Sequence, residues 1–486
     1  MLVRLRPMDT NIQAQICVGW VCSMPSAGVA SLREKLVEDI KAATERVVQK
    51  WPLLAGKAVW LKQDGIFAID VPDTLPDKLF TLTQSTIDVP YPVSDPLSSR
   101  RPGFEPLPDR AHYQGFVVPP TIDTLAKKGM PLLALHFTFF ADAVALGITL
   151  PHQVLDGTGS GLVVKAINAE LWGDTWEVPP MTEANPLAAA VGSLPPPTRE
   201  EVPADYDKVF GRASIPGIVK ALVRSAWEKY WWKTGEVDYL FIRRAVVERL
   251  APEVKEAVRV QTQGKEYVST SDVLTAWVFK TAEFVNSDSP ATLEASGIFS
   301  VRKHLSTPTQ NLESYPHNAV LPYPLFDPPV PFADFSSLSL ADLALRHRRS
   351  LELYRSKPLV AALDRDVAPY PIMPRRELPL PWPLNQLVGK GPTHETSSRC
   401  LWNNLDCDFS RLSLPDPAVE GDAKDRPALP RLAFYFFSIM PFTPDHNDHL
   451  YQVDEGYMLR GALRPQVRKA LEEAVQKLED EFGGSE

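Results

Sequence analysis

One His and one Asp lie four residues apart in the segment Pro-His-Gln-Val-Leu-Asp-Gly at residues 151–157. Imidazole has its unperturbed pKa near neutrality, so His152 could take a proton from a substrate and return it within one turnover. On a helix, residues i and i+4 share a face, so His152 and Asp156 could also form half of a metal site. Such a site needs further ligands at defined spacing. The only other close pair, His446 and His449, stands in an apparent loop, so we predict acid–base chemistry and no metal.

Two apolar runs, residues 132–140 and 143–150, lead directly to His152. Together they are long enough to span a membrane, but an unpaired Asp142 at their middle would be costly in lipid. We therefore predict two buried strands joined by a turn at the central Ala-Asp-Ala. A Gly-rich segment follows His152 and leads into a helix predicted over residues 161–171. Catalytic groups favour loops on rigid scaffolds, and this loop is such a place.

Other chemistries find little support in the sequence. There is no Gly-x-Ser-x-Gly elbow, and no Ser or Cys stands out as a nucleophile, which favours direct attack by a substrate. The Gly-Thr-Gly-Ser-Gly run at residues 157–161 lacks the Gly-Lys-Ser/Thr ending of a nucleotide-binding loop, and its spacing does not fit a dinucleotide fingerprint. Nucleotide binding at this loop is therefore not predicted.

The composition is that of a globular protein with two domains. The chain has 486 residues, 44% of them apolar and 23% charged, which is too long for one core. A net charge of -9 argues against nucleic acid as a partner. The 47 prolines cluster between periodic segments and indicate stiff loops. The N-terminus lacks the basic-then-apolar pattern of a signal peptide. We expect a cytoplasmic protein whose four cysteines are reduced and mostly buried: Cys17, Cys22, Cys400 and Cys407.

Both halves mix strands and helices, which predicts an α/β protein with mixed sheets. The predicted domains are residues 1–205 and 237–486, with a helical linker at 206–236. In that linker we expect an aromatic face packed in a core, formed by Trp227, Tyr230, Trp231 and Trp232. Further helices are expected at residues 31–50, 250–262, 273–284, 338–354 and 464–482, strands at 2–9, 16–24, 57–61, 65–71, 237–247, 297–302, 401–409 and 432–440, and irregular chain at 90–120, 174–205 and 365–396.

The residues around His152 resemble a known family. His-Gln-Val-Leu-Asp-Gly at 152–157 is similar to the HXXXD-G signature of the BAHD acyltransferases, which are CoA-dependent enzymes of plants and fungi. Other segments match the family in order along the chain, and one of them, at 269–277, has the form seen in fungal members. These are Leu-Arg-Pro-Met-Asp at 5–9, Trp-Pro-Leu-Leu-Ala-Gly at 51–56, Ser-Thr-Ser-Asp-Val-Leu-Thr-Ala-Trp at 269–277, Val-Arg at 301–302 and Tyr-Pro-His-Asn at 315–318.

The resemblance implies two chloramphenicol-acetyltransferase-like domains with a channel between them. It implies a monomer that takes acyl-CoA as co-substrate, with no other cofactor, and moves an acetyl or another short or medium acyl group to a hydroxyl or amine of a small secondary metabolite. His152 would be the general base, and Asp156 would pair with Arg302 to hold the loop. Gly157, directly after Asp156, would support this loop structurally. By family position, Ser271, Thr396 and Ser397 would lie on the CoA side, and hydroxyls near residues 396–398 could serve the oxyanion.

Two departures leave alternatives open. Of the family's Asp-Phe-Gly-Trp-Gly element, only Asp408 and Phe409 match, and Ser300 stands where the family has an Asp before the Arg. One alternative is therefore an enzyme of the same fold that uses His152 for a cyclisation, elimination or rearrangement. Another is a non-catalytic binder of small molecules or a partner subunit, although His, Asp and Gly are all retained.

Overall fold

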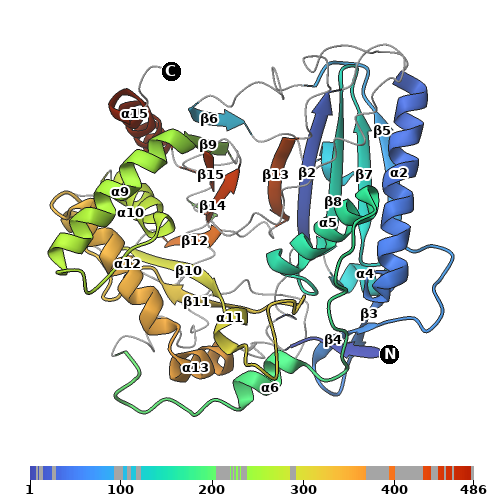
Figure 1. Ribbon diagram of the computed structural model, residues 1–486, viewed down its shortest axis with the longest axis horizontal. Coiled ribbons are helices and arrows are strands. Elements are labelled where there is room, and N and C mark those ends of the chain that lie inside the picture. Colours follow the sequence, from blue (N-terminus) through green and yellow to red (C-terminus); the bar gives the residue numbers. More distant parts are fainter. Residues whose placement is uncertain are drawn as a thin grey trace.

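The computed structural model of the chain describes most of its two halves (Figure 1). The residues described are 1–6, 9, 15–23, 29–91, 102–106, 111–115, 122–203, 219, 223, 226–227, 230, 238–284, 292–367, 393–399, 431–438, 447–453, 456–461, 463 and 465–482.

A five-stranded mixed sheet forms the centre of the N-terminal half. Its order is β13 (Arg431–Ser438), β2 (Gln15–Ser23), β8 (Ala143–Pro151), β7 (Ala134–Phe139) and β5 (Thr81–Thr86). All neighbours are antiparallel except β5 and β7. Every residue of β7 and β8 is buried, which explains why both read as continuous apolar runs. The turn between them lies where the sequence predicts it, since Phe140 N donates to Ala143 O at 2.8 Å.

Two helices cover the outer face of this sheet, α2 (Val29–Lys50) and α5 (Gly157–Trp172) (Figure 1). A second, three-stranded sheet of order β1 (Leu2–Arg4), β4 (Ile66–Asp70) and β3 (Lys57–Leu61) completes this half. The short helices of this half are η1 (Pro52–Ala55), α3 (Ala111–Gln114), α4 (Ile122–Lys128) and α6 (Pro186–Gly192).

The C-terminal half is built on a seven-stranded mixed sheet. Its order is β11 (Val320–Pro324), β10 (Glu294–Ser300), β12 (Thr393–Arg399), β14 (Asn447–Val453), β15 (Gly456–Gly461), β9 (Asp238–Arg243) and β6 (Gly103–Pro106). The helices of this half are α9 (Arg244–Gln261), α10 (Thr270–Phe284), α11 (Arg302–Leu305), η2 (Phe332–Phe335), α12 (Leu340–Tyr354), α13 (Lys357–Val367) and α15 (Pro465–Phe482).

Each half has its own hydrophobic core, and a third, smaller core joins the two large sheets. The joining core brings Cys17 and Ala145 of the five-stranded sheet together with Phe241 and Met458 of the seven-stranded sheet. Cys17 is fully buried there, and its thiol donates to Tyr113 O at 3.9 Å. Cys400 and Cys407 lie outside the described residues.

The two large sheets exchange strands. β13 belongs to the C-terminal half of the sequence but pairs with β2 at the edge of the N-terminal sheet. β6 belongs to the N-terminal half but pairs with β9 at the edge of the C-terminal sheet. The sequence predicts a domain boundary at residues 206–236. Dividing the chain there would separate β6 and β13 from the sheets in which they pair.

Several predicted elements differ from the structure. The stretches 90–120 and 174–205 were expected to be irregular, yet they contain β6, α3 and α6. The strand expected at 237–247 ends at Arg243, because helix α9 begins at the next residue. The strand expected at 401–409 lies outside the described residues.

The aromatic face of the linker was expected to pack in a core, and this expectation was wrong for the two residues described. Trp227 is 60% exposed and Tyr230 is 78% exposed. Helical spacing shows that side chains share a face, but not whether that face points inward. Trp231 and Trp232 lie outside the described residues. Of the helices that the structure describes, none is long and apolar enough to cross a membrane.

Candidate active site

His152 lies in a tight loop between β8 and α5. Strand β8 ends at Pro151, whose carbonyl accepts hydrogen bonds from the N–H groups of Val154 at 3.0 Å and Leu155 at 3.2 Å. Asp156 then caps α5, accepting from Gly159 N at 3.1 Å. The helix therefore begins at Gly157, four residues earlier than predicted, because the cap is the Asp of the motif itself. His152 is partly exposed, while the next five residues are buried.

Asp156 pairs with Arg302 from the other half of the chain. Arg302 Nη1 donates to Asp156 Oδ2 and Arg302 Nη2 donates to Asp156 Oδ1, each at 2.8 Å. Both side chains are buried, with 5% of Arg302 and 3% of Asp156 exposed. The N–H of Ala319 also donates to Asp156 Oδ2, at 3.2 Å. Each carboxylate oxygen thus accepts two hydrogen bonds, and the carboxylate is fully occupied as a brace of the loop.

The electrostatics of this pair follow from its contacts. Burial alone would raise the pKa of Asp156, but the Arg302 guanidinium and the backbone N–H donors outweigh burial, and the pKa lies below its ordinary value. Arg302 donates further, from Nε to Tyr315 O at 2.8 Å and from Nη2 to His317 O at 2.7 Å. Ser300, which replaces an Asp of the family pattern, lies with its Oγ 3.4 Å from Arg302 Nη1. The Arg302 guanidinium therefore has hydrogen-bond acceptors without the Asp that the family has at position 300.

Residues 315–319, called the clamp below, bind the His152 loop through hydrogen bonds from the C-terminal half of the chain. His317 Nδ1 donates to Val154 O at 2.7 Å, and Asn318 Nδ2 donates to His152 O at 2.7 Å and to Gln153 O at 3.2 Å. Burial lowers the pKa of His317 to about 4, so the ring is a neutral donor at physiological pH. Three carbonyls of the loop are thus held by one segment of the other half.

Close contact between backbones also fixes the loop. A Cβ on Gly159 would lie only 1.9 Å from Pro316 O, so no side chain fits at this position. Gly159 is buried in the first turn of α5. Glycine in this run therefore allows the segment 315–319 to approach helix α5 closely. This structural role agrees with the lack of a nucleotide-binding pattern in the run.

Sequence reasoning did not give His317 or Asn318 a role. They were noted only as part of a family-like Tyr-Pro-His-Asn run. Their hydrogen bonds to the loop span 163 to 166 residues of sequence, so no local spacing could reveal them. The polar pair His-Asn in front of a buried strand was the one available signal.

The remaining predicted site residues lie on other elements. Gly157 is the buried first residue of α5, whereas Ser271 lies in the first turn of α10. Thr396 and Ser397 lie on β12, an interior strand of the seven-stranded sheet. Asp408 lies outside the described residues. Asn447 to His449, expected in a loop, begin strand β14, because they pair with β12 and β15.

The acidic residue beside Ser271 has a structural role. Ser269 and Asp272 cap α10 reciprocally, and Asp272 also binds the side chains of Arg348 and His347. His347 Nε2 in turn lies 2.8 Å from the hydroxyl oxygen of Tyr323. This buried network explains why the Ser-Thr-Ser-Asp run is followed by a well-anchored helix.

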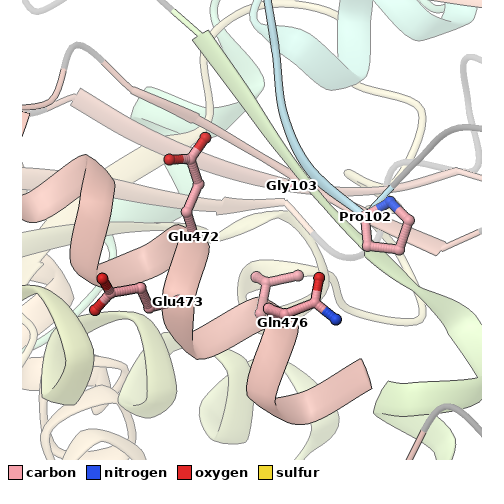
Figure 2. Close-up of a pocket in the computed structure, with 6 residues that line it drawn as sticks. Pro102, Gly103, Glu472, Glu473 and Gln476 are labelled. Atoms are coloured by element: carbon pink, nitrogen blue, oxygen red, sulfur yellow. The ribbon is translucent and has the colours of Figure 1, made fainter. Parts of the chain in front are cut away.

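A separate hollow of about 380 Å³ lies between β6 and α15. Figure 2 shows Glu472, Glu473 and Gln476 along the helix, with Pro102 and Gly103 opposite them. None of these residues belongs to the His152 loop or its clamp. Two carboxylates in the lining make this hollow a poor fit for an anionic ligand.

No family model matches the chain. The transcriptional regulator sdnM of Sordaria araneosa is 29% identical over 293 residues, which cover 57% of this chain and 56% of the relative. The O-acyltransferase pboC of Aspergillus ustus is 31% identical over 158 residues, 32% of each chain. The chain thus spans about half the length, or less, of these curated relatives.

Solved structures match over nearly the whole length. TRI101 of F. sporotrichioides, crystallised with coenzyme A and T-2, has a TM-score of 0.61 at 14% identity, covering 99% of this chain and 98% of that one. Vinorine synthase has a TM-score of 0.53 at 14% identity, covering 98% and 93%. Both are BAHD acyltransferases. This chain has the two-domain BAHD fold. The fold predicted from the sequence is therefore confirmed, and a curated fungal relative named as an O-acyltransferase agrees with the family resemblance.

Proposed function

We propose that this BAHD-fold protein transfers an acyl group from acyl-CoA to a hydroxyl or amine of a small metabolite. The observation that carries the proposal is the braced loop at His152. His152 is partly exposed at the end of a buried strand, while its own carbonyl is held by Asn318 and the loop that follows it is held by the Asp156–Arg302 pair. A base on so restrained a backbone is preorganised for proton transfer.

In the proposed reaction His152 takes the proton of the acceptor O–H or N–H. The freed oxygen or nitrogen pair attacks the thioester carbonyl carbon, and the tetrahedral intermediate collapses with cleavage of the C–S bond. The proton on His152 then passes to the departing CoA thiolate, so the imidazole is neutral again. No nucleophilic residue of the protein is required, in agreement with the lack of a Ser or Cys elbow.

Asp156 has a different role in this proposal. Its two oxygens are fully occupied by Arg302 and backbone N–H groups, so it holds the loop and does not exchange protons. Thr396 and Ser397 of the interior strand β12 are proposed for the CoA side, together with Ser271, by family position. The protein would act as a cytoplasmic monomer, with acyl-CoA and acceptor entering a channel between the two halves from opposite faces.

The test is CoA release coupled to product mass. The full chain is incubated with acetyl-CoA or a short- or medium-chain acyl-CoA and a panel of alcohol and amine metabolites, and free thiol is followed. We expect thiol release equal in amount to an acceptor product heavier by one acyl group, and none with His152→Ala. Conversion of an acceptor without thiol release would instead support the alternative reaction on the same fold.

A further inference from the structure

An exposed apolar stripe lies in the linker between the two halves of the sequence. A spacing of four, four and three residues places on one helix face the residues Val219, Val223, Trp227 and Tyr230, all of which are helical in the structure. Each of these side chains is more than half exposed. Of the nine large apolar side chains that are exposed in the described part of the chain, four fall within these twelve residues. Single exposed apolar residues are ordinary, whereas a gathered set marks an interaction surface.

The sequence that carries this stripe is basic. Residues 216–233 include four basic side chains and one acidic side chain, so the segment has a net charge of +3 although the whole chain has -9. The basic residues recur between and after the apolar ones, and they are Lys220, Arg224, Lys229 and Lys233. Because salt screens charges beyond about 8 Å at physiological ionic strength, the local positive charge governs what approaches this segment.

We propose that residues 216–233 form a membrane-surface segment that binds anionic phospholipids. The apolar stripe enters the boundary between headgroups and acyl chains, where the rings of Trp and Tyr are favoured. The basic groups bind the anionic headgroups, which are abundant on the cytoplasmic leaflet of membranes. Five charged residues in eighteen exclude a segment that crosses the bilayer, so this one lies on its surface. This interaction goes beyond the proposed acyl transfer and does not depend on it.

A protein partner fits the same surface less well. Lys is depleted in protein interfaces, because burying an ammonium group without an acidic partner is costly. Here two Lys residues and one Arg stand in the sequence between Val219 and Tyr230. At a lipid surface, long basic side chains reach the phosphates while their methylene groups stay against the acyl chains. A second copy of this chain is the protein partner that the experiments must exclude.

The first experiment floats the full chain with lipid vesicles in a density gradient. Vesicles of phosphatidylcholine mixed with phosphatidylserine should carry the protein. Vesicles of phosphatidylcholine alone should bind it about 100-fold more weakly, because each net basic charge contributes about fivefold in affinity. Raising the salt from about 0.1 M to about 1 M shortens the Debye length from about 10 Å to about 3 Å and should release the protein. Equal binding to both kinds of vesicle, or binding to neither, would overturn the proposal.

A pair of variants tests the apolar stripe. Val223→Ser combined with Tyr230→Ser should weaken binding to the anionic vesicles at least about tenfold, because two apolar side chains no longer leave water. The matched control is Val260→Ser combined with Tyr267→Ser, at side chains of similar exposure outside the segment. The control should bind like the wild type. An equal loss in the two double variants would show that the stripe is not the binding surface.

A second pair tests the charges. Lys220→Gln combined with Arg224→Gln should weaken binding to the anionic vesicles about 20- to 30-fold. The control is Lys127→Gln combined with Lys128→Gln at the exposed end of α4, which removes the same charge elsewhere. If the control weakens binding as much, the net charge of the whole protein governs binding, and the proposed segment does not.

Light scattering in the absence of lipid separates a lipid surface from a second copy. We expect a monomer for the wild type and for Val223→Ser combined with Tyr230→Ser. A wild-type dimer that becomes a monomer in this variant would show that a second copy covers the stripe, and would overturn the proposal. Both substituted side chains are exposed, so circular dichroism of the variant should match that of the wild type. Vesicle binding is measured without acyl-CoA, so it stands or falls separately from acyl transfer.

Discussion

Arg302 closes on both oxygens of Asp156 at 2.8 Å, across 146 residues of sequence and between the two halves of the fold. Because both of its oxygens accept hydrogen bonds, Asp156 holds the loop in place and is not free to transfer protons. The same Arg binds the carbonyls of Tyr315 and His317, so one side chain holds the loop and its clamp together. His152 is thereby left as the one partly exposed side chain in the segment 151–157.

Replacing the proposed base should remove turnover and leave the fold intact. We expect His152→Ala to lower kcat by about 10²- to 10⁴-fold, the usual share of general base catalysis. Its melting temperature should stay close to that of the wild type, because Asn318 binds the backbone carbonyl of residue 152 and not the ring. Thiol release and thermal melts measure the two effects. Wild-type turnover in this variant would rule out the base.

Breaking the brace should cost stability as well as rate. Asp156→Ala or Arg302→Ala leaves a buried partner charge uncompensated, which costs about 3–5 kcal/mol of unfolding free energy. The double variant should lose less than the sum of the single variants, because no orphan charge is left. Urea unfolding measures this cycle. The control pair, Glu256 and Arg259, is largely exposed, so its variants should unfold much like the wild type. Additive losses at the brace would show that the pair is not coupled.

A single methyl group should displace the clamp. Gly159→Ala places a Cβ at 1.9 Å from Pro316 O, so the helix and segment 315–319 must move apart. We expect a loss of about 1–3 kcal/mol and a lower kcat, since overpacking shifts the backbone that carries His152. The control is Gly192→Ala at the end of α6, where a Cβ meets nothing within 4 Å. Equal melting temperatures for the two variants would exclude the tight contact.

The buried network at Asp272 should dominate acid unfolding of the C-terminal half. Burial opposes ionisation of Asp272, but His347, Arg348 and Ser269 outweigh it and hold its pKa well below the ordinary value. Its stabilisation is therefore present above the unfolded pKa of about 4 and is lost as pH falls through the lower folded value. Asp272→Asn should be less stable than wild type at pH 7 and differ less at pH 2. Urea midpoints at both pH values measure this, and a difference independent of pH would contradict it.

The sequence predicted elements whose signal is local. The strands that lead to His152, helix α2 and the capped helix α10 follow from apolar runs, helical spacing and a Ser-Asp cap. Strands β5, β6, β14 and β15 carry no such signal, because short or polar strands are stabilised by their neighbours in the sheet. The pairing of Asp156 with Arg302 came from a family resemblance alone. The contacts of Asn318 with the His152 loop are non-local, so only the structure reveals them.

The exchange of β13 and β6 has a consequence for how the chain is made. The nascent N-terminal half can pair β2 with β8, but the other edge of β2 stays open until β13 has been synthesised. An open strand edge is a template for pairing with other chains. The half-made protein is therefore the species most exposed to aggregation, and neither half can complete its own sheet when produced alone.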